Sequence, residues 1–287
     1  MNHGRPSSTK ADIPPASTAP LVGWHCVHHY YEFDRQVLAN LDSGTIAEGC
    51  KLVTHVLDGT WEGRPERLQT SVVSGHKADF GIMMMDPDPI SIDRVHQALL
   101  ASDLGPALRP TYSFVSMSEI SEYLPTVDDY RNRLVRDGLE GEILETKVKV
   151  YADRQPAMRQ HRLSPEFPEW PATCFYPMNK KRESPVNWFV LPKSRRAAMM
   201  SEHGRSGMTY SGKVTQLVTT SVGLDDWEWG VTLWAKNPQY LKDIVYEMRF
   251  DEASAKYAEF GPFYTSYVMS AAEMLKHCFV GITPDIQ

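Results

Sequence analysis

Two short stretches of the sequence carry side chains suited to redox and ligand chemistry. In CFYPMNKKR, Tyr176 and Met178 come just before three consecutive cations that begin at Lys180. In MMSEHG, His203 follows Met199 at helical spacing, so a methionine surface continues into an imidazole. A phenol can be oxidised, an imidazole can bind a metal, and clustered cations bind carboxylates. Together these stretches suggest a potential metal ligand, an oxidisable phenol and cations for a carboxylate-bearing ligand.

Each of these residues also has a purely structural interpretation. A tyrosine before proline usually packs in a core with its hydroxyl hydrogen bonded, and a run of cations usually lies on a solvated face. Half-buried histidines are common and are mostly hydrogen bonded. Gly204 predicts that the helix ends directly after His203, which would place the imidazole on the last turn. There the imidazole could cap the helix, pack or coordinate.

The composition excludes several classes of protein. A chain of 287 residues with 42% hydrophobic residues can bury a sizeable core, and a net charge of −6 argues against binding to nucleic acid or to a membrane surface. Four widely separated cysteines argue against a zinc site or a disulfide scaffold and favour a reducing, cytoplasmic setting. Residues 1–20 lack the apolar core of a signal peptide, and we expect them to be a disordered tail. No apolar run is long enough to span a bilayer, so we expect no membrane segment.

Hydrophobic periodicity predicts one supersecondary pattern twice. The order strand, helix, strand, strand, helix, strand fits residues 21–123, and it recurs in the last third of the chain, beginning with a strand at NWFVLP, residues 187–192. Each copy matches the ferredoxin-like βαββαβ arrangement. We therefore predict an α+β protein with two tandem ferredoxin-like repeats packed sheet to sheet, as in a dimeric α+β barrel. The predicted domains are residues 21–123 and 176–287.

A long connector separates the two repeats. Residues 124–175 are charged at first and proline-rich later. Ordinary loops have a median length of roughly 4 to 6 residues, so a connector this long is either disordered or functional. A cover over a binding pocket is one such function.

Several motifs in matching order resemble a known family. YPMNKKR, NWFVLP, MMSEHGRSGMTYSGKVTQL and IVYEMRFDEAS are similar to the chlorite dismutase superfamily, and within it to the coproheme decarboxylases. The resemblance is dense over residues 160–267 and weaker over 21–123. It implies that hydrogen peroxide drives oxidative decarboxylation of two propionates of coproheme III (Fe-coproporphyrin III) to vinyl groups, giving haem b via harderoheme. Coproheme would be both substrate and redox cofactor. The resemblance further implies a homopentamer and a transient contact with a ferrochelatase.

The same resemblance assigns roles to individual residues. It implies that His203 is the iron ligand, that Tyr176 forms the radical which attacks a propionate, and that Lys180 assists at the second propionate. Gln216 matches the residue above the open face of the iron. The remaining porphyrin contacts that it implies are Met178, Tyr123, Arg162, Trp188, Trp227, Arg249 and Ser254.

Two departures from the family pattern affect these expectations. Chlorite-degrading members carry an arginine where this chain has Gln216, and a neutral amide argues against chlorite as the substrate. The connector between Tyr123 and Arg162 is longer than expected, which makes Tyr123 the least secure of the matched positions. Chlorite dismutase or general haem peroxidase activity, a non-catalytic haem carrier or sensor, and a haem-free assembly module remain as alternatives.

Overall fold

The computed structural model describes residues 14–282. Most of the predicted disordered tail, residues 1–13, lies outside this range, and residues 14–20 form neither helix nor strand. The N-terminal repeat consists of β1 (His25–Phe33), α1 (Arg35–Asn40), α2 (Ser43–Asp58), β2 (Arg67–Val73), β3 (Phe80–Asp86), α3 (Pro89–Leu100), the short 3-10 helix η1 (Gly105–Ala107) and β4 (Leu108–Ser118). Two helices follow in the connector, α4 (Val127–Arg136) and α5 (Gly141–Leu163).

The C-terminal repeat begins earlier in the chain than the sequence pattern suggested. It consists of β5 (Ala172–Lys180), β6 (Arg182–Glu183), β7 (Val186–Asn187), α6 (Lys193–Met208), β8 (Val214–Thr220), β9 (Trp229–Ala235), α7 (Pro238–Met248), α8 (Glu252–Tyr257), β10 (Ala258–Phe260), β11 (Tyr264–Val268) and α9 (Ala271–His277). No helix within residues 14–282 combines the length and the apolar character that crossing a membrane requires.

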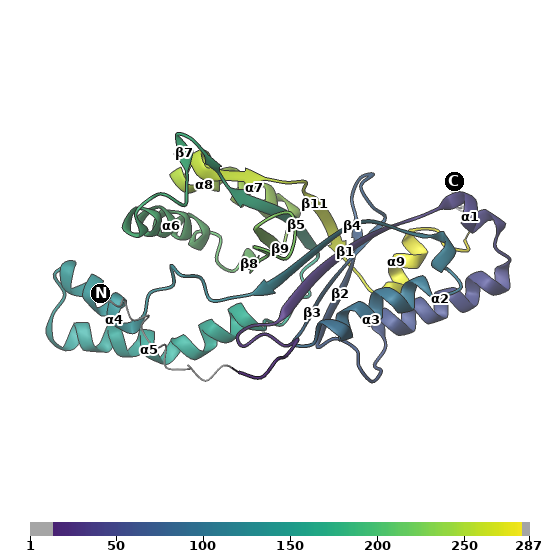
Figure 1. Ribbon diagram of the computed structural model, residues 1–287, viewed down its shortest axis with the longest axis horizontal. Coiled ribbons are helices and arrows are strands. Elements are labelled where there is room, and N and C mark those ends of the chain that lie inside the picture. Colours follow the sequence, from purple (N-terminus) through teal and green to yellow (C-terminus); the bar gives the residue numbers. More distant parts are fainter. Residues whose placement is uncertain (1–13, 283–287) are drawn as a thin grey trace, which may run out of the picture.

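The strand order confirms the predicted α+β fold. Strands run β2-β3-β1-β4 in the first repeat and β8-β9-β5-β11 in the second, which is the same ferredoxin-like order. Antiparallel pairs β11–β2 and β4–β8 join the repeats, and β5–β9 completes a closed ring of strands (Figure 1). The two sheets therefore face each other across the interior of one barrel.

The barrel interior is filled with aromatic side chains. Phe114, Phe175 and Tyr264 belong to one buried cluster there, and the His28 ring stacks on Phe175 with 4.0 Å between centroids. Burial lowers the pKa of His28 to about 3, so the imidazole is neutral, and its Nε2 lies 2.9 Å from Thr232 Oγ1. Alternate residues of each strand point to the interior and to the outer face. Because aromatic side chains fill the interior, a large ligand can bind only on the outer, helix-covered face.

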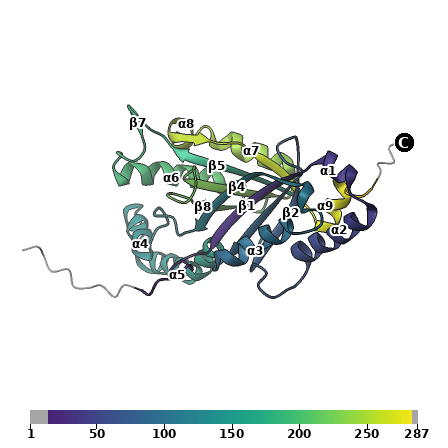
Figure 2. The ribbon, with the colours of Figure 1, turned by 45° about the vertical axis from the view of Figure 1, so that its right-hand side comes forward.

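The outer faces of the two repeats differ. On the N-terminal repeat, α2 and α3 form a continuous core with α9, which comes from the end of the chain (Figure 2). On the C-terminal repeat, α7 packs on β5, β8 and β9, and α6 packs on α7 and α8, but Val218 of β8 remains 42% exposed and Gln216 is also exposed. The helix layer therefore leaves part of β8 open.

Three local predictions were wrong. Residues 187–192 form the end of a small hairpin and a turn, while the first strand of the repeat is β5, whose alternating pattern was obscured by Pro177. Helix α6 continues through Gly204 to Met208, because that glycine keeps a negative φ, so His203 lies in the body of the helix. The connector is not a loop: a capping box at Thr126 starts α4, and a small apolar cluster packs it on α5.

Candidate functional site

The sheet register gathers the predicted residues of the C-terminal repeat on its outer face. Tyr176 of β5 pairs with Val231 of β9, which in turn pairs with Val218 of β8. Met178 lies two residues further along β5 on the same face, and Gln216 lies two residues before Val218. Tyr176, Met178 and Gln216 therefore share one surface, and its exposed part includes Val218 and Gln216.

Tyr176 is a buried, neutral phenol in an aromatic setting. It is 6% exposed, stacks on Phe263 with 4.5 Å between centroids, and meets Phe260 edge to face. Burial raises its pKa well above the ordinary value, against a smaller lowering by Arg249. A phenolate is therefore disfavoured, and oxidation of this side chain must remove the proton together with the electron.

His203 is oriented by a carboxylate that sequence reasoning missed. Its Nδ1 lies 2.8 Å from Oδ2 of Asp251, whose side chain is 2% exposed and accepts a further hydrogen bond from the Ser254 backbone N–H. Burial alone would raise the pKa of Asp251, but the hydrogen bonds from His203 and Ser254 outweigh it and the pKa lies below its usual range. With Nδ1–H donating to Asp251, Nε2 carries no proton and is able to bind a metal.

The signal for Asp251 was only partly readable in the sequence. Asp251 is the N-cap residue of α8, and the pattern of an aspartate three residues before Ser254 is typical of such a cap. A cap pattern does not reveal that the second carboxylate oxygen faces a helix 48 residues earlier in the chain.

Lys180 is a desolvated cation. Its Nζ donates to the carbonyl of Ala253 at 3.1 Å and lies 4.5 Å from the centre of the Trp188 ring. Burial lowers its pKa to about 8, with Asp251 acting in the opposite direction. Within residues 14–282 it forms no ion pair. Such a group gains most from a carboxylate brought by a ligand.

Lys180→Met is expected to stabilise the ligand-free protein at pH 7 by on the order of 1 kcal/mol, because it removes the cost of burying a charge. The pKa of Lys180 is about 8 in the folded protein against 10.5 ordinarily, so the unfolded chain binds more protons between these values. Wild-type stability should therefore rise across this pH window, and the slope should shrink in the variant. Urea unfolding of the wild type and the variant at pH 7 and pH 10 measures both the stabilisation and the dependence of stability on pH. The exposed neighbour provides the control, Lys181→Met, and equal behaviour of the two variants would contradict this interpretation.

The other predicted contacts divide into two groups. Tyr123 and Trp188 border one cluster with Met199 of α6, and Ser254 Oγ lies 3.4 Å from His203 Nδ1. Arg249 follows α7, and its guanidinium lies over Phe260, beside Tyr176. By contrast, Trp227 packs against the interior aromatic cluster, on the other side of the sheet from Tyr176.

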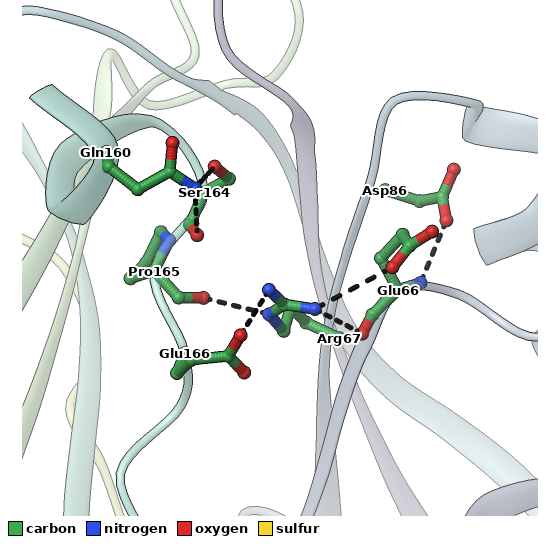
Figure 3. Close-up of polar contacts among 7 residues, drawn as sticks. All are labelled: Glu66, Arg67, Asp86, Gln160, Ser164, Pro165 and Glu166. Carbon is green, nitrogen blue, oxygen red and sulfur yellow. Dashed lines mark hydrogen bonds and ion pairs between the residues drawn. The ribbon is translucent and has the colours of Figure 1, made fainter.

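Arg162 is the penultimate residue of α5 and is exposed. The segment after it is held to β2 by Arg67, which donates to Pro165 O at 3.2 Å and pairs with Glu166 at 2.5 Å (Figure 3). This anchored segment forms one wall of a cleft of about 360 Å³ beside β8. Its lining includes His161, Glu166, Trp170, Thr215, Gln216 and Trp234. The end of α5 thus lies near Gln216, although the two are far apart in sequence.

The available donors fit a metal that is already bound in a macrocycle and needs one ligand from the protein. Within the described range, residues 14–282, no group of three or more histidine, cysteine or acidic side chains is arranged to hold a metal ion. His203 is a single oriented donor, with an apolar strand surface and several cations nearby. An iron porphyrin with carboxylate arms meets these conditions, since it needs one axial ligand from the protein.

Comparison with known families matches residues 45–269 to the family described as chlorite dismutase. The chain belongs to the chlorite dismutase family. A solved structure described as a novel heme-binding protein from Thermus thermophilus is 31% identical, with a TM-score of 0.75, over 91% of this chain and 96% of that one. A mutant chlorite dismutase from Candidatus Nitrospira defluvii is 16% identical, with a TM-score of 0.68, over 90% and 97%. At that identity the second likeness supports the fold alone.

The part of the chain that matches the chlorite dismutase family contains every residue proposed for the site. It begins within α2, includes Tyr123 and Arg162, and ends after β11. Strand β1 and helix α9 lie outside it. The matched range therefore includes both helix α6 with His203 and strand β5 with Tyr176.

Proposed function

We propose that this protein is a coproheme decarboxylase, which uses hydrogen peroxide to convert two propionates of coproheme III into vinyl groups and so forms haem b. The observation that carries the proposal is the pairing of His203 with Asp251, in the same repeat as the buried, neutral Tyr176 on the outer sheet face. The 31% identical protein described as heme-binding supports a haem-type ligand. Lys180 and Arg249 supply charge for a ligand with carboxylate arms.

The reaction balances with one peroxide for each propionate. The side chain loses one hydrogen from its β-carbon, carbon dioxide and, in total, two electrons. Hydrogen peroxide takes up these electrons with two protons and becomes two waters. When bound, the iron porphyrin supplies the peroxide-driven oxidation, and the protein has to direct it to one arm of the ring.

Each proposed residue has a task that its surroundings support. Tyr176 loses its electron and phenolic proton together and then takes the hydrogen from the propionate, which avoids a charged radical in a buried site. Lys180 holds the carboxylate of the reacting or the second propionate. His203, held by Asp251, would bind the iron, and Gln216 would supply a neutral amide that suits peroxide better than a charged chlorite ion.

The decisive experiment mixes purified protein with coproheme, titrates peroxide and follows the porphyrin by mass spectrometry. We expect stepwise loss of two carboxyl groups through a monovinyl intermediate to haem b. Oxygen release from chlorite with an unchanged porphyrin would favour a chlorite dismutase. Tight binding without chemical change would favour a non-catalytic haem carrier or sensor. The absence of a Soret shift would reject a haem protein altogether.

Three further expectations rest on the same family resemblance. We expect a homopentamer, which light scattering after size exclusion measures. We also expect a cytoplasmic protein that receives coproheme by transient contact with a ferrochelatase, and co-migration of the two proteins in the presence of coproheme tests this contact.

A further inference from the structure

Arg196 on α6 is a largely buried guanidinium with spare donors. Its side chain is 18% exposed. Nε donates to the hydroxyl of Tyr123 at 3.1 Å, and Nη1 donates to the carbonyl of Leu191 at 3.0 Å. Nη2 faces a carboxylate oxygen of Glu122 at 3.6 Å, which is beyond hydrogen-bond distance. The two fixed contacts orient the guanidinium and leave N–H groups for another acceptor.

Arg196 shares a helix face with the proposed iron ligand. It precedes His203 by seven residues, which is about two turns and roughly 10 Å along the helix. Tyr123, its hydrogen-bond partner, packs against the apolar cluster that contains Trp188. The ammonium of Lys180 lies over the Trp188 ring. Tyr123 lies in the segment that leaves β4 and passes to α4 beneath α6 (Figure 1). Arg196 therefore lies where this segment meets the helix that holds His203.

The partner that Arg196 has in the ligand-free protein is weakly held. The Glu122 side chain is half exposed, and an exposed ion pair without a hydrogen bond contributes little to stability. Glu119 lies close enough that Glu122 adds to the effect of burial in raising the Glu119 pKa. Glu119 therefore adds negative charge beside Glu122, and a better-placed carboxylate can displace Glu122 from Arg196.

We propose that Arg196, with the Tyr123 hydroxyl, binds one carboxylate arm of the porphyrin, and that Glu122 occupies this position until the ligand arrives. The inference rests on the proposed function. Coproheme carries four carboxylates, while the cations assigned so far are Arg162, Lys180 and Arg249. Arg196 supplies the fourth. The site would therefore favour a tetracarboxylate porphyrin over haem b, which has only two carboxylates.

A pair of neighbouring substitutions tests the proposal. Arg196→Met should weaken binding of iron-free coproporphyrin III at least about tenfold, because it removes a buried charge-assisted pair. Arg195→Met is the matched control, since Arg195 is adjacent, half exposed and paired with Glu252 at 2.5 Å. Its affinity should stay at the wild-type level. Glu122→Gln should tighten binding, because the competing charge is gone. Quenching of tryptophan fluorescence gives the dissociation constants.

The outcomes separate this inference from the function on which it rests. Arg196→Met should lose less affinity for haem b than for coproporphyrin, and thermal melting verifies that each variant is folded. Equal affinities of folded Arg196→Met and Arg195→Met for coproporphyrin would overturn the role of Arg196 and leave the proposed function intact. If the wild-type protein binds neither porphyrin, the proposed function itself fails.

Discussion

Tyr176→Phe is expected to bind coproheme with nearly wild-type affinity and to release almost no carbon dioxide when peroxide is added. The ring can keep its stacking on Phe263, and only the hydroxyl is lost. We expect the rate of propionate loss to fall by at least about a hundredfold, in line with the removal of a positioned proton-transfer group. Single-turnover mixing followed by mass spectrometry of the porphyrin measures this rate.

A second buried tyrosine provides the control for this substitution. Tyr264 lies on the neighbouring strand β11, paired with Phe175, but its ring belongs to the interior cluster on the opposite face of the sheet. Tyr264→Phe should therefore leave the decarboxylation rate unchanged. Normal turnover by Tyr176→Phe would remove the radical role from Tyr176, and an equal loss in both variants would point to a general effect on the barrel.

The repeats could be read from the sequence because their strands alternate strongly. Strands β4 and β9 carry an apolar side chain at every second position over several residues, and this pattern can be recognised without knowing which strands they pair with. Strand β5 was missed as the start of the second repeat because Pro177 and a proline-rich approach interrupt its pattern. The pairing of β5 with β9 and β11 compensates for the proline, and that pairing exists only in the folded barrel.

The sequence predicted those candidate residues whose chemistry follows from their type. It did not predict those whose role depends on a contact with a residue far along the chain. Tyr176, Lys180 and His203 were found from their motifs. Asp251 and Arg196 were not, since each acquires its proposed role from a partner 48 or 73 residues away. The same limit explains why Trp227 was expected to contact the porphyrin: its packing against the interior cluster is visible only in the fold.

The difference between the two repeats favours the second one for the proposed site. In the N-terminal repeat the outer sheet face is sealed by α2, α3 and α9, and His29 of β1 stacks on His96 of α3 with 4.9 Å between centroids. Burial lowers the pKa of His29 to about 4, so its ring is neutral and packs against His96. In the C-terminal repeat the helix layer leaves β8 partly open, which gives a planar ligand access to the strand surface.

His203→Ala is expected to weaken binding of coproheme by about a hundredfold while leaving the affinity for iron-free coproporphyrin III almost unchanged. The reason is that the imidazole contributes only through the metal, whereas the cations and the apolar strand surface hold the rest of the ring. Titrations of both porphyrins, followed by absorbance and fluorescence, give the two affinities. An equal loss for both would mean that His203 serves packing, and the proposed ligation would be wrong.

Asp251→Asn separates the orientation of His203 from the stability of α8. Asparagine is as good an N-cap as aspartate, so the helix and its bond from the Ser254 N–H should persist. The amide oxygen can still accept from His203 Nδ1, but it lacks the charge that makes Nε2 a stronger donor to iron. We expect binding of coproheme to weaken about 10- to 100-fold, the range typical of such supporting carboxylates, with a shifted Soret band. Ser254→Ala should shift the Soret band less than Asp251→Asn, because it removes only the hydroxyl that donates to Asp251 Oδ2 at 3.3 Å and keeps the carboxylate. A wild-type spectrum and affinity in Asp251→Asn would show that this carboxylate only caps its helix.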